Sequence, residues 1–191
     1  MILKNLCWVY ENSLPKHICN NIINYCLNKR TTKRGMVKHP TAQKTRDSFV
    51  VWNPEVWIKN IVMRYIVDAN KKAGWNFDIE ECEDIQFTIY KPKQHYDWHY
   101  DAGEEPYPKG NKHVGRTRKI SASVILNSEY KGGDFLFNFR NEPDPTITRK
   151  IKNKNQGTVI VFPSHARHKV DKVTKGMRYS LVCWSLGKPF K

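Results

Sequence analysis

The N-terminal third of the chain has the apolar spacing of two α-helices. Between residues 14 and 27 the apolar positions follow one face of a helix, at Ile18, Cys19, Ile22, Ile23, Cys26 and Leu27. Pro15 suits the first turn of that helix, where no backbone N–H is needed. After a β-branched and aromatic run over 48–52, the pair Asn53-Pro54 predicts the start of a second helix, and Gly74 predicts its end. We therefore expect two helices separated by a short strand.

After Gly74 the pattern changes to short strand-like runs separated by turn residues. The runs are 85–90, 96–100, 120–127, 134–139, 158–162 and 179–184. This spacing is typical of an all-β barrel or sandwich. Because no linker rich in Pro or Ser separates the two halves, we expect one mainly β domain over 1–191. Residues 1–84 would form a helical N-terminal support, and residues 85–185 would form the β-core.

The composition adds a large surplus of positive charge. The 191 residues include 33 Lys or Arg and 18 Asp or Glu, which gives a formal net charge of +15. The basic residues cluster over Lys29–Arg46, Lys109–Lys119 and Arg149–Lys154. Such clusters are either a solvated surface or a rim that meets an anionic partner, such as nucleic acid or an acidic protein segment. Aromatic residues do not interleave with the first cluster, so charge by itself does not indicate a nucleic-acid protein.

The sequence carries no pattern typical of membrane insertion, secretion or disulfide bonding. No apolar run approaches the roughly 20 residues of a membrane-spanning helix, and the N-terminus has no sustained apolar stretch or small-residue cleavage site. We expect a cytoplasmic protein with no membrane partner, in the host cytoplasm if a phage encodes it. The five cysteines are scattered and form no C-x-x-C pair, so neither a disulfide framework nor a cysteine-rich zinc site is expected.

The candidate chemistry lies in a segment rich in histidine and aspartate after the run over 85–90. It contains His95-Tyr-Asp97 and His99-Tyr-Asp101. Residues two apart on a strand face the same side, so each pair could give an imidazole nitrogen and a carboxylate oxygen to one metal. Taken alone, such a pair is more often two polar residues at a strand end. A third ligand is available at His165 or His168, and two histidines with one carboxylate form the facial triad of non-haem Fe(II) oxygenases.

Arg178 strengthens the interpretation as a metal site. It stands ten residues after His168, in the strand-like segment GMRYSLVCW. A guanidinium beside an apolar strand needs a buried anion, and it binds a carboxylate through two parallel hydrogen bonds. A dicarboxylate such as 2-oxoglutarate would chelate the metal at one end and meet Arg178 at the other. Ser180 shares the strand face of Arg178 and would hydrogen-bond the same carboxylate.

Three segments together resemble the Fe(II)/2-oxoglutarate-dependent oxygenases, specifically the prolyl-4-hydroxylase-like group and its stand-alone PKHD-type hydroxylases of bacteria and phages. They are IQFTIYKPKQHYDWHYDAG, RKISASVILNSEYKGGDFLF and GTVIVFPSHARHKVDKVTKGMRYSLVCW, within roughly residues 85–185. The resemblance implies a double-stranded β-helix, a jelly-roll or cupin-like core, packed against the N-terminal helices. It also implies Fe(II), 2-oxoglutarate and O2, with ascorbate as a candidate reductant.

The resemblance selects among the candidate ligands. The family has an aromatic residue three positions before the first ligand histidine and spaces the last ligand histidine ten positions before the arginine, which implies His99, Asp101 and His168 as ligands. Arg178 would then bind the cosubstrate. The other residues expected at the cosubstrate pocket are Tyr90, Tyr96, Ser123, Val170, Ser180 and Trp184. In two places the chain departs from the family. Lys93 stands where relatives commonly have glycine, and Ile125 stands where animal prolyl hydroxylases tend to carry a tyrosine that helps to bind the cosubstrate.

The activity that the resemblance implies is that of a prolyl 4-hydroxylase-like dioxygenase. Such an enzyme couples decarboxylation of 2-oxoglutarate to succinate with hydroxylation of a substrate C–H bond. The favoured substrate is a prolyl residue in a protein or peptide, and an acidic segment is one candidate. The net charge keeps a nucleic-acid oxygenase or demethylase as an alternative. A non-catalytic cupin-like binding module is the alternative outside enzymes, and a zinc hydrolase with the same ligands would leave Arg178 without a role.

Overall fold

The computed structural model describes residues 5–28, 33–35, 45–53, 55–138 and 148–190. The helices among them are α1 (Lys16–Asn28) and α2 (Val56–Lys72). The second helix starts later than predicted, because Asn53 still belongs to strand β4 (Phe49–Asn53). Glu55 is the N-cap residue, and the side-chain oxygen of Asn53 accepts a hydrogen bond from the Glu55 backbone N–H (2.9 Å).

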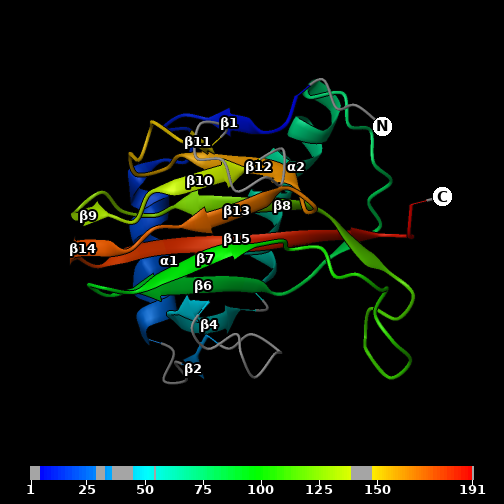
Figure 1. Ribbon diagram of the computed structural model, residues 1–191, viewed down its shortest axis with the longest axis horizontal. Helices are drawn as coiled ribbons and strands as arrows, with labels where there is room; N and C mark the ends of the chain where they lie inside the picture. The colour runs from blue at the N-terminus through cyan, green and yellow to red at the C-terminus, as the bar shows by residue number, and fades with distance from the viewer. Residues whose placement is uncertain (1–4, 29–32, 36–44, 54, 139–147, 191) are drawn as a thin grey trace.

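The larger of the two main sheets has the strand order β1-β12-β8-β15-β6-β4-β2, and β5 also pairs with β15. Its other strands are β1 (Trp8–Tyr10), β2 (Lys33–Arg34), β5 (Glu81–Cys82), β6 (Ile85–Tyr90), β8 (Thr117–Ile125), β12 (Val159–Pro163) and β15 (Arg178–Gly187). Both helices pack on one face of this sheet and lie behind it in Figure 1.

The smaller sheet has the order β11-β10-β13-β7-β3 and lies on the opposite face of the larger sheet (Figure 1). Its strands are β3 (Arg46–Asp47), β7 (His95–His99), β10 (Phe135–Asn138), β11 (Thr148–Lys150) and β13 (Arg167–Val170). A separate two-stranded ribbon of β9 (Tyr130–Gly132) and β14 (Val173–Gly176) stands at one end of the molecule, on the left in Figure 1. All strand pairs among the described residues whose register is given are antiparallel.

Two apolar cores hold these layers together. The first joins the buried faces of the helices, such as Ile22 and Ile58, to the larger sheet at Phe87 and Leu181. The second lies between the two sheets and is rich in aromatic side chains, which include Phe135, Phe137 and Phe162. The fold is therefore a helix layer and a sandwich of two sheets, and the site described below opens between the two sheets.

Most of the predicted elements are present, and several short strands were missed. All six predicted runs after Gly74 overlap strands β6, β7, β8, β10, β12 and β15. The first 84 residues supply more than helices, since β1, β2, β4 and β5 extend the larger sheet. Most of the basic segment Lys29–Arg46 lies outside the described residues. Neither described helix is long and apolar enough to cross a membrane.

Candidate active site

The larger sheet turns a polar face toward the smaller sheet. Along β6, β8 and β15, alternate side chains such as Phe87, Val124 and Leu181 pack toward the helices. The intervening residues therefore face the other way. Buried polar residues at these positions are Gln86, Thr88, Tyr90, Ser121, Ser123, Arg178 and Ser180. Because buried polar groups need partners, this face favours a binding site over a simple apolar core.

A β-bulge directs the first site histidine into the space between the sheets. His99 at the end of β7 pairs in register with His168 on β13, and the next registered pair is Tyr96 with Val170. Strand β7 therefore advances three residues while β13 advances two, which is a bulge. As a result, Tyr96 and His99 line the same cavity although they are three residues apart.

The two H-x-D pairs line different cavities. His95 and Asp97 line a different groove of about 500 Å³, and Asp97 is exposed. His165 is exposed too and contacts the rings of Phe77 and Phe190, so it is not part of the site. The structure thus separates these residues from His99, Asp101 and His168.

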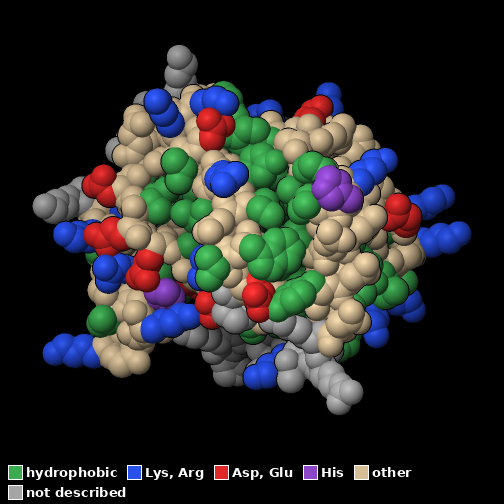
Figure 2. All heavy atoms as spheres, turned by 180° about the vertical axis from the view of Figure 1, so that it is seen from behind, with side chains coloured by type: hydrophobic (Ala, Val, Ile, Leu, Met, Phe, Trp, Pro, Cys, Tyr) green, Lys and Arg blue, Asp and Glu red, His purple; other side chains and the backbone are tan. Residues whose placement is uncertain are grey.

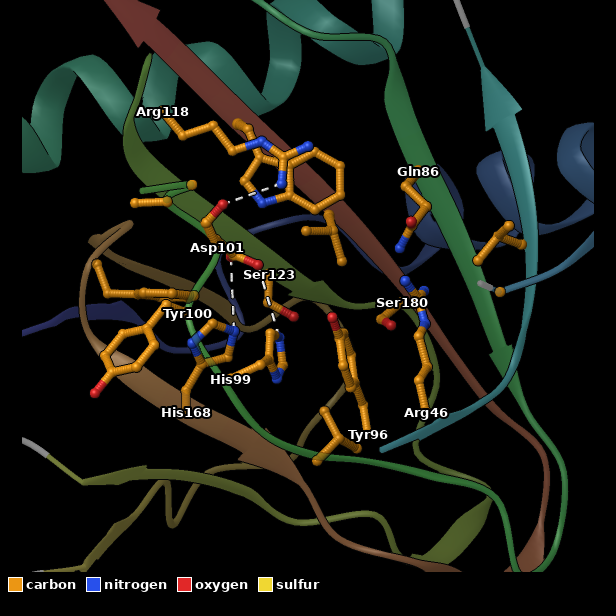
Figure 3. Close-up of a pocket in the computed structure, with 18 of the residues that line it drawn as sticks. Arg46, Gln86, Tyr96, His99, Tyr100, Asp101, Arg118, Ser123, His168 and Ser180 are labelled. Atoms are coloured by element: carbon orange, nitrogen blue, oxygen red, sulfur yellow. Dashed lines mark hydrogen bonds and ion pairs between the residues drawn. The ribbon is translucent and has the colours of Figure 1, made fainter. Parts of the chain in front are cut away.

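Asp101 completes the cluster from the turn after β7. Its backbone N–H and that of Ala102 both donate to the Ser164 carbonyl (3.0 and 2.9 Å), which fixes the turn against the end of β12. The two carboxylate oxygens of Asp101 lie 3.7 Å from His99 Nε2 and 3.6 Å from His168 Nε2. One ligand atom from each of the three side chains lies within 4.8 Å of the others, and Figure 3 shows them converging.

Hydrogen bonds orient both histidines for metal binding. The Nδ1 atoms of His99 and His168 lie 2.7 and 2.9 Å from the carbonyl oxygens of Asp97 and Ala166. In the tautomer that donates these hydrogen bonds, each Nε2 presents its lone pair to the cluster. Burial lowers the pKa of His99 to about 3, and the nearby His168 adds to the effect. The His99 ring is therefore neutral at physiological pH, the form that a metal requires.

Asp101 is held as a carboxylate inside the protein. Its burial by itself would raise the pKa, but the nearby His168, His99 and Arg118 lower it below the usual range. Its Oδ2 atom is buried and accepts no hydrogen bond from a described residue. A buried carboxylate oxygen without a hydrogen bond is costly, and a cation between it and the two imidazole rings removes that cost. The three side chains therefore fit Fe(II).

Arg178 lies in the same cavity at the start of β15. Its side chain is fully buried, with 1% of its surface exposed. Nη1 donates to the Ser180 hydroxyl (2.9 Å), and the guanidinium carbon lies 5.4 Å from the centre of the Tyr90 ring. The Nε–H is buried without a partner, and among the described residues no carboxylate pairs with this guanidinium. A permanent charge in this position fits the distal carboxylate of a dicarboxylate ligand.

One cavity of about 1130 Å³ connects the candidate ligands to Arg178. All the other residues expected at the cosubstrate pocket line it as well, namely Tyr90, Tyr96, Ser123, Val170, Ser180 and Trp184. At its mouth the indole of Trp52, which is 46% exposed, lies 6.0 Å from that of Trp184. The cavity therefore has a charged interior and an aromatic mouth.

Three further lining residues were missed in the sequence. The Arg46 guanidinium lies 4.7 Å from the centre of the Tyr96 ring and bonds to the Ser48 hydroxyl, and Figure 3 places it inside the pocket. The Arg118 guanidinium lies 3.9 Å from the centre of the Trp184 ring. Both arginines fall in basic clusters, which hid them among solvated charges. Gln86 was detectable, because it is a polar residue inside the apolar run of β6.

A search against protein families matches one family to more than half of the chain. The profile of the 2OG-Fe(II) oxygenase superfamily covers residues 85–186. Among curated relatives, a PKHD-type hydroxylase of Pseudoalteromonas atlantica is 32% identical over 101 residues, which are 52% of this chain and 41% of the relative. The match thus spans less than half the length of that relative.

Solved structures share the fold over nearly the whole chain. A viral collagen prolyl hydroxylase of Paramecium Bursaria Chlorella virus-1, in complex with 2OG, gives a TM-score of 0.72 at 20% identity and covers 96% of this chain and 97% of its own. A prolyl hydroxylase of Trichoplax adhaerens, in complex with a hypoxia inducible factor peptide fragment, gives a TM-score of 0.73 at 18% identity over 95% and 84% of the two chains. These likenesses confirm the predicted double-stranded β-helix fold.

Proposed function

Because this chain belongs to the 2OG-Fe(II) oxygenase superfamily, we propose that it is a prolyl hydroxylase-like dioxygenase. It would couple the decarboxylation of 2-oxoglutarate to succinate with hydroxylation of a C–H bond. The observation that carries this proposal is a juxtaposition in one cavity. A cluster of two imidazoles and one carboxylate lies there with a buried guanidinium that has no carboxylate partner among the described residues.

Each residue of the cluster has a defined part in this proposal. His99, Asp101 and His168 would hold Fe(II), which together with O2 and 2-oxoglutarate supplies the oxidising chemistry when bound. Arg178 would bind the distal carboxylate of 2-oxoglutarate, and Ser180 would fix the direction of its guanidinium through the 2.9 Å hydrogen bond. The surrounding Phe135, Phe162 and Val170 would exclude bulk water.

The proposed substrate is a prolyl residue in a peptide or protein segment. The structural relative from Trichoplax adhaerens carries a bound peptide fragment. The exposed indole of Trp52, with the buried indole of Trp184 behind it, offers an aromatic surface that suits the apolar ring of proline. The basic residues at the mouth do not favour an acidic segment or nucleic acid as the substrate. Arg116 is paired with Glu80 and Glu81, and Arg118 with Glu83, so their charges are compensated.

The test is an anaerobic titration of the purified protein with Fe(II) and 2-oxoglutarate. We expect a visible metal-to-ligand charge-transfer band in the wild type and no band in Asp101→Ala, because the variant loses the carboxylate ligand. The chain supplies its own matched control in Asp97→Ala. This variant removes the aspartate of the other H-x-D motif, which lines the separate groove, and it should retain the band.

A second measurement addresses turnover. Wild-type protein with Fe(II), O2, 2-oxoglutarate and a proline-containing peptide should consume one 2-oxoglutarate and release one succinate and one CO2 for each oxygen atom added to the peptide, as followed by mass spectrometry. A folded wild type without the charge-transfer band would contradict the metal and cosubstrate site. A band without peptide hydroxylation, over a panel of prolyl peptides, would contradict the substrate class alone.

A further inference from the structure

The end of the molecule that carries the ribbon β9–β14 is basic. Four exposed lysines gather there: Lys93, Lys131, Lys172 and Lys175. Lys131 and Lys175 belong to the two strands of the ribbon, Lys172 precedes β14, and the backbone N–H of Lys93 donates to the Val173 carbonyl (2.7 Å). Figure 2 shows Lys and Arg side chains projecting from this end, which is on the right in that view. We call these four residues the basic end.

Lys93 occupies a backbone conformation that disfavours any side chain. Its φ is +74°, in the left-handed region where glycine is the usual residue. The turn from Lys91 to Gln94 would be easier to form with glycine at this position, and the backbone hydrogen bond to Val173 does not depend on the side chain. A lysine at position 93 is therefore less favourable for the stability of this turn than a glycine would be.

The ribbon contains a second arrangement that opposes stability. Lys131 and Lys175 are register partners on antiparallel strands, so their ammonium groups lie on the same face of the ribbon. Like charges directly opposite each other destabilise a strand pair. None of the four lysines of the basic end forms an ion pair with another described residue, so nothing within the described protein offsets the repulsion.

The acidic residues nearby are already engaged. Asp134 pairs with Lys150 and with Lys154 (2.6 Å), and Asp171 pairs with Lys169 (2.7 Å). Two exposed acids lie near the ribbon. The carboxylate of Glu129 accepts a hydrogen bond from the Ser128 backbone N–H, and that of Asp97, in the groove that Lys172 also lines, accepts one from the Trp98 backbone N–H (2.8 Å). The basic end thus keeps a net positive charge at close range, which an external anion would neutralise.

We propose that the basic end is a docking surface for nucleic acid, which it holds through the phosphate backbone. The turn with Lys93, strand β14 and strand β9 are adjacent, at the roughly 5 Å spacing of neighbouring strands. A nucleic-acid strand carries one charge every ~3.4 Å of its axis, so one strand can contact all four lysines. Tyr130, the aromatic residue of the ribbon, packs against the core between the sheets, so no ring of the ribbon is free to stack on bases and the contact would be independent of base sequence.

This surface is distinct from the cavity of the candidate active site. Strand β15 links the two ends, from Arg178 near the ribbon to Gly187 beside β5. The mouth residues Glu104 to Tyr107 lie in the loop on the right in Figure 1, away from β9 and β14. The inference does not rest on the proposed function, because binding through the basic end requires neither metal nor cosubstrate.

The test is fluorescence anisotropy with a labelled DNA duplex of about 20 base pairs, titrated with metal-free protein at several NaCl concentrations. If each of four phosphate contacts releases ~0.9 counterions, a plot of the logarithm of the association constant against the logarithm of the NaCl concentration should have a slope of about −3 to −4. Lys131→Glu should weaken binding at least about fivefold at 100 mM NaCl and should reduce the slope by about 1 or more. Lys93→Gly should also weaken binding, with the smaller effect of losing a single charge.

The stability of the same variants separates docking from a structural role. Lys131→Glu places opposite charges across the ribbon, and Lys93→Gly relieves the left-handed residue. Both variants should therefore keep or raise Tm while they lose affinity for DNA. The matched control is Lys188→Glu, which makes the same charge change just beyond the far end of β15 and should alter the affinity less than twofold.

Three results would overturn the proposal. The first is the absence of salt-dependent DNA binding by folded wild-type protein. The second is an equal loss of affinity in Lys188→Glu and Lys131→Glu, which would assign the binding to net charge. The third concerns Met177, which is 45% exposed just after β14. If phosphatidylserine vesicles bind in a Lys131-dependent manner and DNA does not, the surface belongs to a membrane contact.

Discussion

At the scale of single residues, Arg178 is the charge that most needs a ligand. Among the described residues it is the largest fully buried side chain, and there it meets a serine hydroxyl and an aromatic face instead of a carboxylate. A buried charge without a counterion is expensive. We therefore expect this residue to bind a ligand carboxylate strongly, because the guanidinium is already removed from water when the protein folds and not when the ligand binds.

We predict that Arg178→Ala raises the dissociation constant of 2-oxoglutarate at least about 100-fold. Two charge-assisted hydrogen bonds are worth roughly 3 kcal/mol together. The measurement is the charge-transfer band titrated with 2-oxoglutarate at saturating Fe(II). Arg178→Lys keeps the charge but loses the planar fork, so it should fall between the wild type and Arg178→Ala. An unchanged constant in folded Arg178→Ala would remove this role.

A pH dependence of stability is expected from Asp134, which joins β10 to Lys150 of β11 and to Lys154. Burial raises the pKa of its carboxyl, but the hydrogen bonds from the two lysines outweigh burial and lower it below the usual value. Because the pKa is lower in the folded state, the ionised carboxyl stabilises the fold at pH values above the unfolded-state pKa of ~3.9. This stabilisation disappears as the pH falls through the folded-state pKa.

The variant that tests this is Asp134→Asn. We predict that it is less stable than the wild type at pH 7 and that the difference in free energy of unfolding shrinks as the pH falls below about 4. Urea unfolding at both pH values measures it. A difference that stays constant with pH would mean that the carboxylate charge contributes nothing to the link between these strands.

At the scale of elements, the start of α1 depends on one glycine turn. Gly157 has φ +86°, and the Leu14 backbone N–H donates to its carbonyl (3.0 Å). A Cβ on Gly157 would lie 2.1 Å from the Leu14 carbonyl oxygen. The turn before β12 and Leu14, two residues before α1, are therefore in direct backbone contact, which fixes the start of the helix against the larger sheet.

We predict that Gly157→Ala costs about 3 kcal/mol or more of the free energy of unfolding, since it adds a backbone clash to a disfavoured φ. Gly74→Ala is the matched control, because Gly74 has φ +72° but open space around its Cβ position. It should cost only about 1 kcal/mol. Chemical denaturation of the two variants measures both values. Equal costs would contradict the close approach of Leu14.

Sequence reasoning found the elements whose own pattern is strong and missed those that depend on partners. The long alternating runs of β6, β8 and β15 were predicted, while two- and three-residue strands such as β3 and β9 exist only through pairing with a neighbour. In the site, the bulge in β7 breaks the rule of alternation, so the period of the strand could not tell His99 from His95. The spacing of ligand residues in the related family was what selected His99.

At the scale of the whole molecule, ligand binding should stabilise the fold. The metal cluster joins β7, the turn after it and β13, and Arg178 adds β15, so one ligand set connects both sheets. Any ligand that binds the folded protein alone raises its stability by mass action. This link is independent of turnover and can be measured without substrate.

We predict that Mn(II) together with 2-oxoglutarate, each at about 100 times its dissociation constant, raises Tm by roughly 5 °C or more. A chelator should reverse the shift. Asp101→Ala should show no shift, while Asp97→Ala should behave as the wild type. Differential scanning fluorimetry measures all four conditions. A shift in Asp101→Ala equal to that of the wild type would place the ligands elsewhere.

The two ends of the molecule also differ in how far their charges are balanced. Seven of the 18 acidic residues fall within 78–84 and 104–105, beside the far end of β15 and the cavity mouth, and four of them pair with Lys59, Lys112, Arg116 or Arg118. The four lysines around the ribbon β9–β14 have no such partners among the described residues. The positive charge is therefore unbalanced at the ribbon, and a polyanion exerts a torque that turns the ribbon toward it. Seated on nucleic acid, the molecule would present its mouth to the solution. It would then reach neighbouring bound proteins and not the strand beneath it.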